Sequence, residues 1–255
     1  MAEPISRRDR LRAATVQEIK QAARRALVEQ GTGGLSLRGV ARDLGLTAPA
    51  LYRYFPSREV LLEHLIADIY DEACAEMTAA ADTLPADDLG GRLLTASRTF
   101  RRWALAHPPE FALLFGSPID GVSRAPGADA PEPDGAAPRT VTEGPVHEAG
   151  QRFGAIFAGL VAGLYVARPF PVPADDEIET PLREQLEAWC DRLPVPLPLG
   201  VMQVFLSCWI RLYGSVCMEA FGHLRFAVQD AEPIFEAELR SLADLLGHPD
   251  AYRRP

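Results

Sequence analysis

Eight residues between positions 36 and 58 have side chains suited to contact with double-stranded DNA. Small side chains let a helix lie deep in the major groove, where methyl groups contact thymine, while hydroxyls and arginines bind phosphate. The candidate DNA-binding residues are Ser36, Arg38, Thr47, Ala48, Ala50, Tyr52, Tyr54 and Arg58. Thr47, Ala48 and Ala50 would face bases, and the tyrosines and arginines would bind phosphates.

Two short helices, expected at residues 37–44 and 47–55, must position these side chains. Ser36 and Thr47 are good N-caps for them, and Gly45 ends the first helix. A small residue in the first helix, a glycine at the turn and apolar residues at fixed places are typical of a helix-turn-helix, whose second helix presents its N-terminal residues to base edges. An ordinary helical hairpin shows the same pattern, and Tyr54 also occupies one of its core positions. The pattern alone leaves these alternatives open.

Charge is divided unevenly along the chain. The formal net charge of −9 over 255 residues argues against a nucleic-acid partner. However, residues 1–66 hold 11 basic and 7 acidic residues, a balance of +4, and the remainder carries −13. Such asymmetry is a hint of a nucleic-acid-binding end.

Apolar periodicity predicts helices throughout and no convincing strand, so the expected fold class is all-α. Besides the two short helices, we expect helices at residues 7–30, 58–83, 89–106, 109–115, 146–166, 199–221 and 232–246, and an amphipathic piece at 184–193. Residues 116–146 contain six prolines and five glycines. They are therefore expected to form a mobile loop.

The helix at 146–166 contains a run of 15 uncharged residues, 153–167. A membrane span needs about 20 apolar residues, so a buried core helix is the favoured interpretation and no membrane partner is expected. The N-terminus has basic residues but no apolar segment behind them, which is unlike a signal peptide. We expect a cytoplasmic protein.

The stretch L-S-L-R-G-V-A-R-D-L-G-L-T-A-P-A-L-Y-R-Y-F-P-S-R-E-V-L-L, residues 35–62, resembles the DNA-binding module of TetR-family transcriptional regulators. The resemblance covers about residues 7–66. Tyr54 replaces a frequent histidine and Arg58 a usual lysine. Near the other end, Trp209, Gly214, Glu219, Gly222 and His223 look like the Trp-His-Gly type of TetR C-terminal domain, with Tyr213 in place of its histidine.

This resemblance implies an N-terminal three-helix DNA-binding domain, residues 1–66, and a larger helical domain for effector binding and dimerisation, residues 67–255. Aromatic residues on the helices that enclose the effector pocket of TetR-like proteins become candidate ligand contacts, together with one histidine. They are Trp103, His107, Phe111, Phe115, Phe153, Phe157, Phe205 and Trp209. Each aromatic could instead belong to the core, and the histidine could be satisfied by backbone.

The helix at 199–221 is apolar nearly all round, because its polar side chains before the end fall on every fourth residue. One core cannot cover such a helix, so a second subunit is expected against it and the last helix. The interface candidates of this homodimer are Met218, Phe221, Phe235, Leu239 and Leu242.

Enzyme signatures are absent from the sequence: there is no G-x-S-x-G, H-E-x-x-H or P-loop motif, and the four cysteines include no C-x-x-C pair. We expect no catalysis, cofactor or metal. The leading hypothesis is a ligand-responsive transcriptional regulator, a repressor released from a pseudo-palindromic operator by a small hydrophobic or aromatic effector. The alternative is a helical small-molecule-binding or adaptor protein that does not bind DNA.

Overall fold

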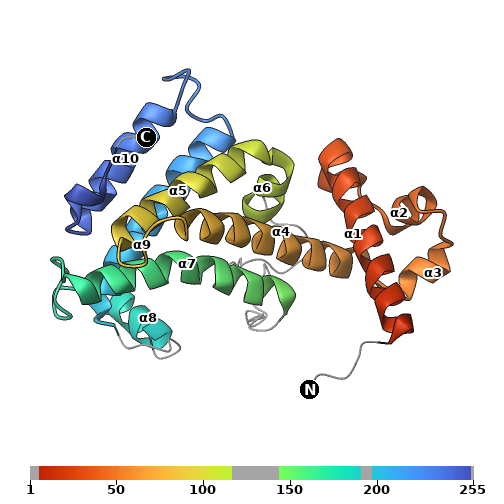
Figure 1. The fold of residues 1–255 in the computed structure, drawn as a ribbon, viewed down its shortest axis with the longest axis horizontal. Helices are drawn as coiled ribbons and strands as arrows, with labels where there is room; N and C mark the ends of the chain where they lie inside the picture. Colours follow the sequence, from red (N-terminus) through yellow and green to blue (C-terminus); the bar gives the residue numbers. More distant parts are fainter. Residues whose placement is uncertain (1–5, 117–143, 191–196, 254–255) are drawn as a thin grey trace. The chain divides into compact units, whose positions relative to one another are not determined.

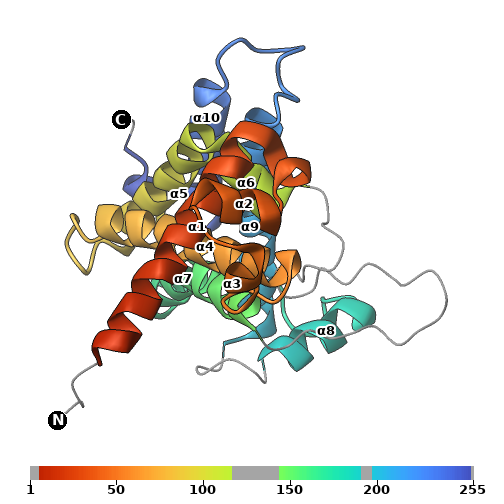
Figure 2. The same ribbon diagram turned by 90° about the vertical axis from the view of Figure 1, so that its right-hand side faces the viewer.

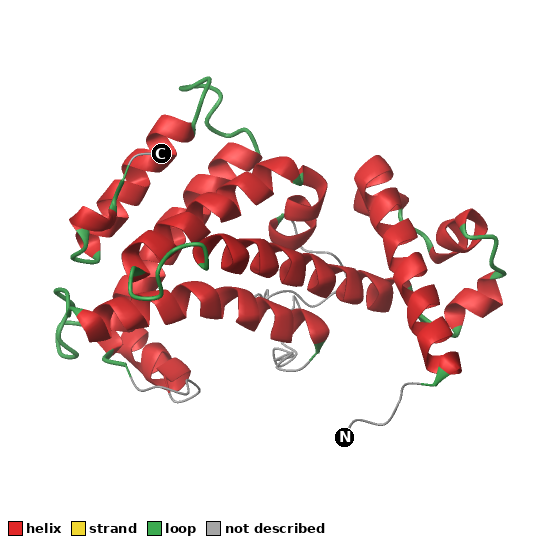
Figure 3. Cartoon of the chain, viewed as in Figure 1, coloured by secondary structure: helices red, strands yellow, loops and turns green. Residues whose placement is uncertain are grey.

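The computed structural model describes residues 6–116, 144–190 and 197–253. Within these ranges the chain forms ten α-helices and one short 3₁₀ helix and no strand (Figures 1 and 3). The predicted all-α fold is confirmed. Of the expected loop, residues 117–143 lie outside the described ranges, and α7 begins at Pro145, just before the expected end of that loop.

Two compact units make up the chain. The first contains Met1–Glu72 and His107–Phe153, and the second contains Ala73–Ala106 and Gly154–Pro255. The first unit therefore includes α6 (Pro108–Phe115), which the sequence analysis assigned to the C-terminal domain. Long-range contacts explain the difference, because Arg24 of α1 donates to Glu110 of α6 and Phe115 of α6 packs on Tyr70 of α4.

The first unit begins with α1 (Arg7–Gly34), whose helical conformation is interrupted at Gly31, where φ is 70°. It buries Ile19, Ala23 and Leu27 on one side. The short helices α2 (Leu37–Asp43) and α3 (Ala48–Tyr52) follow (Figure 2). The predicted second helix of the helix-turn-helix ends three residues too late, because the chain leaves the helix as it approaches Pro56.

Helix α4 (Arg58–Ala81) is held to α1 by ion pairs. Lys20 Nζ lies 2.6 Å from a carboxylate oxygen of Asp68, and Arg24 pairs with Glu72 one turn further along α4. Tyr70 of α4 meets Phe115 and Phe153, with ring centroids 5.8 and 5.5 Å away. These contacts give the first unit its core.

The second unit contains α5 (Leu89–Ala106), most of α7 (Pro145–Ala167), α8 (Thr180–Cys190), α9 (Leu199–Ala220), α10 (Glu232–Leu245) and a 3₁₀ turn (Pro249–Ala251). Phe100 of α5 stacks on Trp209 of α9 with centroids 6.3 Å apart. Helices α9 and α10 lie side by side and are linked by Arg211, which donates to Glu238 and Ser241.

By length and composition alone, α7 and α9 could cross a membrane. Their inward sides nevertheless pack inside the second unit, where Phe157 and Leu164 of α7 and Phe205 of α9 are buried. Core helices of globular proteins have the same length and composition, so this feature is weak evidence for a membrane span.

Candidate nucleic-acid interface and ligand cavity

Side-chain caps and one glycine fix the helix-turn-helix. Ser36 Oγ accepts a hydrogen bond from the backbone N–H of Gly39 at 3.1 Å, and Thr47 Oγ1 accepts from that of Ala50 at 3.4 Å. Both predicted N-caps are confirmed. Between the helices Gly45 has a φ of 65°, a left-handed conformation that glycine adopts without strain.

The candidate DNA-binding residues differ in exposure. Ser36, Arg38, Thr47 and Tyr52 are exposed, whereas Ala48, Ala50, Tyr54 and Arg58 are half-buried. Tyr54 lies under the guanidinium of Arg12, with the ring centroid 5.5 Å from Arg12 Cζ. Arg58 Nε donates to the carbonyl of Leu35 at 3.0 Å. These last two side chains therefore have structural contacts that the sequence analysis did not expect.

The sequence analysis missed a groove beside α3. The groove has a volume of about 770 Å³ and is formed by the start of α1 and the end of α3. Its arginines are Arg7, Arg8, Arg12 and Arg53. The run R-R-D-R-L-R at residues 7–12 was the available signal, but only the fold shows which of these side chains share a surface with α3.

The candidate effector residues fall in both units. Phe111, Phe115 and Phe153 pack with Tyr70 in the core of the first unit, with ring centroids 5.0 to 5.8 Å apart. His107 precedes α6, and its carbonyl accepts from the N–H of Phe111 at 2.8 Å. In these positions Phe111 and Phe153 are buried core residues, and Phe115 is half-buried.

An apolar cavity in the second unit is lined by Phe157, Phe205 and Trp209, the other predicted aromatics. Trp103 is buried but does not line it. Helices α5, α7, α9 and α10 form the walls, and the volume is about 40 Å³. Pockets for drug-sized ligands measure about 300–1,000 Å³, so this cavity is too small to hold such a ligand without widening.

Few polar groups reach this cavity. Ser97 Oγ donates to the carbonyl of Leu93 at 2.9 Å, and burial raises the pKa of the Cys208 thiol to about 11, so that thiol stays neutral. Burial and the charge of Arg168 lower the pKa of His248. His248 also borders the cavity, and its Nε2 is a buried atom without a hydrogen-bond partner among the described residues.

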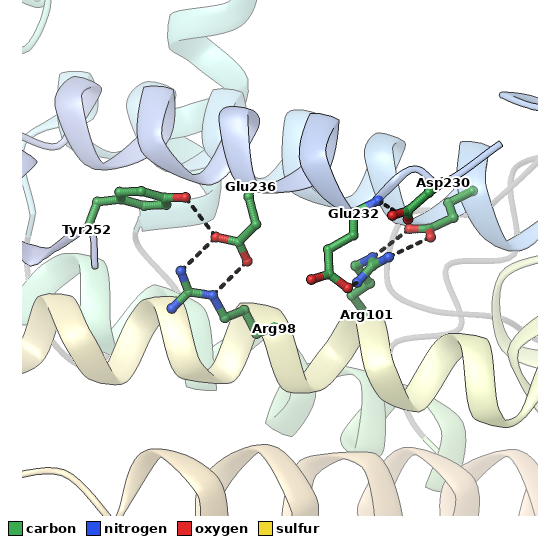
Figure 4. Close-up of polar contacts among 7 residues, drawn as sticks. Arg98, Arg101, Asp230, Glu232, Glu236 and Tyr252 are labelled. Atoms are coloured by element: carbon green, nitrogen blue, oxygen red, sulfur yellow. Dashed lines mark hydrogen bonds and ion pairs between the residues drawn. The ribbon is translucent and has the colours of Figure 1, made fainter. Parts of the chain in front are cut away.

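Ion pairs fasten α5 to α9 and α10 (Figure 4). Arg98 binds Glu236 through two bonds of 2.8 and 2.7 Å, and Tyr252 donates to the same carboxylate at 3.0 Å. Arg101 binds Glu219 through two bonds of 2.6 and 2.7 Å and Glu232 through one of 3.3 Å. Hydrogen bonds donated to the carboxylates raise the pKa of both arginines further, so the pairs remain charged.

The predicted dimer residues also divide into two groups. Phe235, Leu239 and Leu242 of α10 are buried within the second unit, and the two leucines line the cavity, so they belong to the core rather than to a free surface. Met218 and Phe221 are exposed. Ile210 and Ile234, which the sequence analysis did not name, are also exposed, with exposed fractions of 66% and 50%.

Two family models match the chain. One, described as bacterial regulatory proteins of the tetR family, covers residues 13–65, and one described as the tetracycline repressor-like C-terminal domain covers residues 93–242. The chain belongs to the TetR family. It is therefore a transcriptional regulator with a helix-turn-helix DNA-binding domain, and not an enzyme, as the sequence predicted.

Relatives of this TetR-family chain extend over nearly its whole length. It is 31% identical to the HTH-type transcriptional regulators Rv1816 of Mycobacterium tuberculosis and Mb1846 of Mycobacterium bovis over 230 residues, which is 90% of this chain and 91% of each relative. The crystal structure of SCO4313, described as a regulatory protein, has a TM-score of 0.67 and 27% identity, covering 94% of this chain and 100% of that one. A TetR/AcrR regulator from Thermobifida fusca shares the fold, with a TM-score of 0.53, 18% identity and coverage of 94% and 100%.

Proposed function

We propose that this TetR-family chain is a homodimeric, cytoplasmic repressor that leaves a pseudo-palindromic operator when a small hydrophobic molecule binds its second unit. Operator binding is supported by one observation, the exposure of Arg38, Thr47 and Tyr52 on the helix-turn-helix. Thr47 and the small residues after it would face bases, and Arg38 and Tyr52 would bind phosphates.

Selection of binding sequences from a pool of random duplexes tests operator recognition. Tyr52→Ala should weaken binding to all duplexes alike, because a phosphate contact carries no sequence information. Substitutions of Thr47 or Ala50 should change which bases are selected. Equal losses for all variants with an unchanged base preference would contradict this division of roles.

The homodimer is supported by apolar side chains left uncovered on α9 and α10. Ile210 and Phe221 of α9 lie three helical turns apart on one side, and Gly214 lies between them. A Cβ added to Gly214 would meet nothing within 4 Å, so this side is open to a partner helix. On α10, Ile234 and Leu245 are exposed on one side in the same way. We propose that a second copy of this chain covers these exposed residues. The predicted contacts Phe235, Leu239 and Leu242 would then lie outside the interface, because they are buried within the second unit.

The effector proposal rests on the apolar cavity lined by Phe157, Phe205 and Trp209. An apolar ligand that widens this cavity would contact mainly hydrocarbon, because the lining side chains are almost all apolar. The ligand would bind more tightly to a conformer of the dimer whose two recognition helices are not spaced to fit the operator. Its binding would therefore lower the affinity for the operator by the ratio of its affinities for the two conformers.

Small phenols and aliphatic alcohols are suitable probes for the cavity, because each is a small and mostly apolar molecule. In a variant that keeps only Trp209, their binding should quench fluorescence and release the selected duplex. By reciprocity the duplex should weaken probe binding by the same factor. Quenching without release of the duplex would show that the cavity is not an effector site.

A further inference from the structure

The groove formed by α1 and α3 is strongly basic. Arg7, Arg8, Arg12 and Arg53 are all exposed along it, and none of its described lining residues is acidic. The ion pairs of the described residues use other side chains. Four guanidinium groups are therefore available to an outside anion.

We propose that this groove binds the phosphodiester backbone of duplex DNA, beside the bases that α3 reads. The inference rests on DNA binding by the helix-turn-helix and adds a second contact surface from α1. Arginine suits this role because its planar guanidinium pairs with phosphate through two parallel hydrogen bonds. The groove thus lengthens the protein's contact along the duplex.

Continuity with the helix-turn-helix favours DNA over a free anion. Ala50 is a candidate base contact and also lines the groove. Arg53 follows it by three residues, so it lies on the same side of the α3 turn. Tyr54 closes one side of the groove beneath Arg12, which holds the Arg12 guanidinium near α3. A backbone that passes α3 in the major groove would therefore meet the arginines of α1 next.

The chain offers a charge-matched control on the same helix. Arg10 is exposed and carries the same charge as Arg8, but it does not line the groove. Asp9 lies outside the groove as well, and its carboxylate accepts a hydrogen bond from Ser6 Oγ at 2.6 Å. A diffuse attraction between α1 and DNA would depend equally on Arg8 and Arg10, whereas a bound phosphate would depend on Arg8.

The experiment measures the affinity of the full chain for duplex DNA over a range of salt concentrations, for wild type, Arg8→Ala, Arg10→Ala and Arg12→Lys. Each phosphate contact contributes about −0.9 to the slope of log K against log salt. Arg8→Ala should reduce the magnitude of the slope by about that amount for each protomer bound. Arg10→Ala should leave it unchanged. Arg12→Lys keeps the charge, so it should weaken binding with a nearly constant slope.

Two duplexes separate the failure of this inference from the failure of operator recognition. One is the sequence selected from the random pool, and the other is a random-sequence duplex. If no sequence is selected but Arg8→Ala still reduces the slope on the random duplex, operator recognition fails and the groove stands. Equal slopes for Arg8→Ala and Arg10→Ala on both duplexes would overturn the groove while leaving operator recognition intact.

Discussion

Arg24 of α1 binds two carboxylates from different helices. Its terminal nitrogens donate to Glu72 of α4, and its Nε donates to Glu110 of α6 at 3.0 Å. Glu110 is almost completely buried, with an exposed fraction of 5%. Replacing Arg24 with Met keeps an unbranched apolar stem of similar reach but removes the cation. The perturbation therefore leaves a buried carboxylate without its ion-pair partner.

The size of the effect follows from burial. Removing one partner of a fully buried ion pair costs about 3–5 kcal/mol, whereas an exposed pair contributes about 0.2–1 kcal/mol. The side chains of Arg24 and Glu72 are 29% and 36% exposed, and Glu110 lies in the first turn of α6, where the helix dipole favours a negative charge. We therefore expect Arg24→Met to lower the free energy of unfolding by about 2 kcal/mol, and Glu72→Gln by at most about 1 kcal/mol.

Thermal unfolding followed by far-ultraviolet circular dichroism measures this effect. A loss of about 2 kcal/mol corresponds to a fall of roughly 4–8 °C in Tm for a chain of this size. Glu110→Gln removes the buried charge, so adding it to Arg24→Met should recover about half of the loss, because a neutral amide is less costly to bury. If the double variant melts no higher than Arg24→Met, the unpaired Glu110 is not the cause.

Three further predictions concern acid stability, assembly and the core. The hydrogen bond from Arg24 lowers the pKa of Glu72 below 4.5. The ionised Glu72 carboxylate therefore stabilises the fold above pH 4.5, and this stabilisation is lost as the pH falls through the lowered pKa. Glu72→Gln should accordingly flatten the acid side of a plot of Tm against pH. Ile234→Arg should give folded monomers by light scattering, whereas Leu239→Arg should unfold the chain, because only Leu239 is buried in the second unit. Trp103→Ala should lower the free energy of unfolding by about 3–5 kcal/mol in urea titrations, since Trp103 is buried without lining the cavity.

Local patterns predicted most of the fold. The helix-turn-helix could be located from the sequence because its determinants are local: Ser36 and Thr47 cap helices, and Gly45 takes the left-handed conformation between them. The longer helices were also found within a few residues, since apolar periodicity depends on the nearest turns.

Exposure could not be predicted in the same way. Helix α10 carries one apolar stripe that includes Phe235 and Leu239 and another that includes Ile234. Both stripes are apolar, and the sequence does not say which one is covered by α5 and α9 of the same chain. The buried stripe was therefore predicted as the dimer surface. Tyr54 and Arg58 show the same difficulty, because their partners Arg12 and Leu35 are distant in the sequence.

The second unit combines a small apolar cavity with ion pairs on the same helix, α5. The first half of α5 supplies Leu93 and Leu94 to the cavity wall, and its second half holds α10 and α9 through Arg98 and Arg101. The walls are close-packed side chains, so a ligand larger than the cavity must displace part of a lining helix or its side chains. Such a shift would strain the ion pairs of α5, and this cost would be subtracted from the binding energy of the ligand. A ligand shifts the equilibrium toward the conformer with the widened cavity only as far as it binds that conformer more tightly than the conformer with the small cavity. Ligands that fill the widened cavity completely are therefore favoured as effectors.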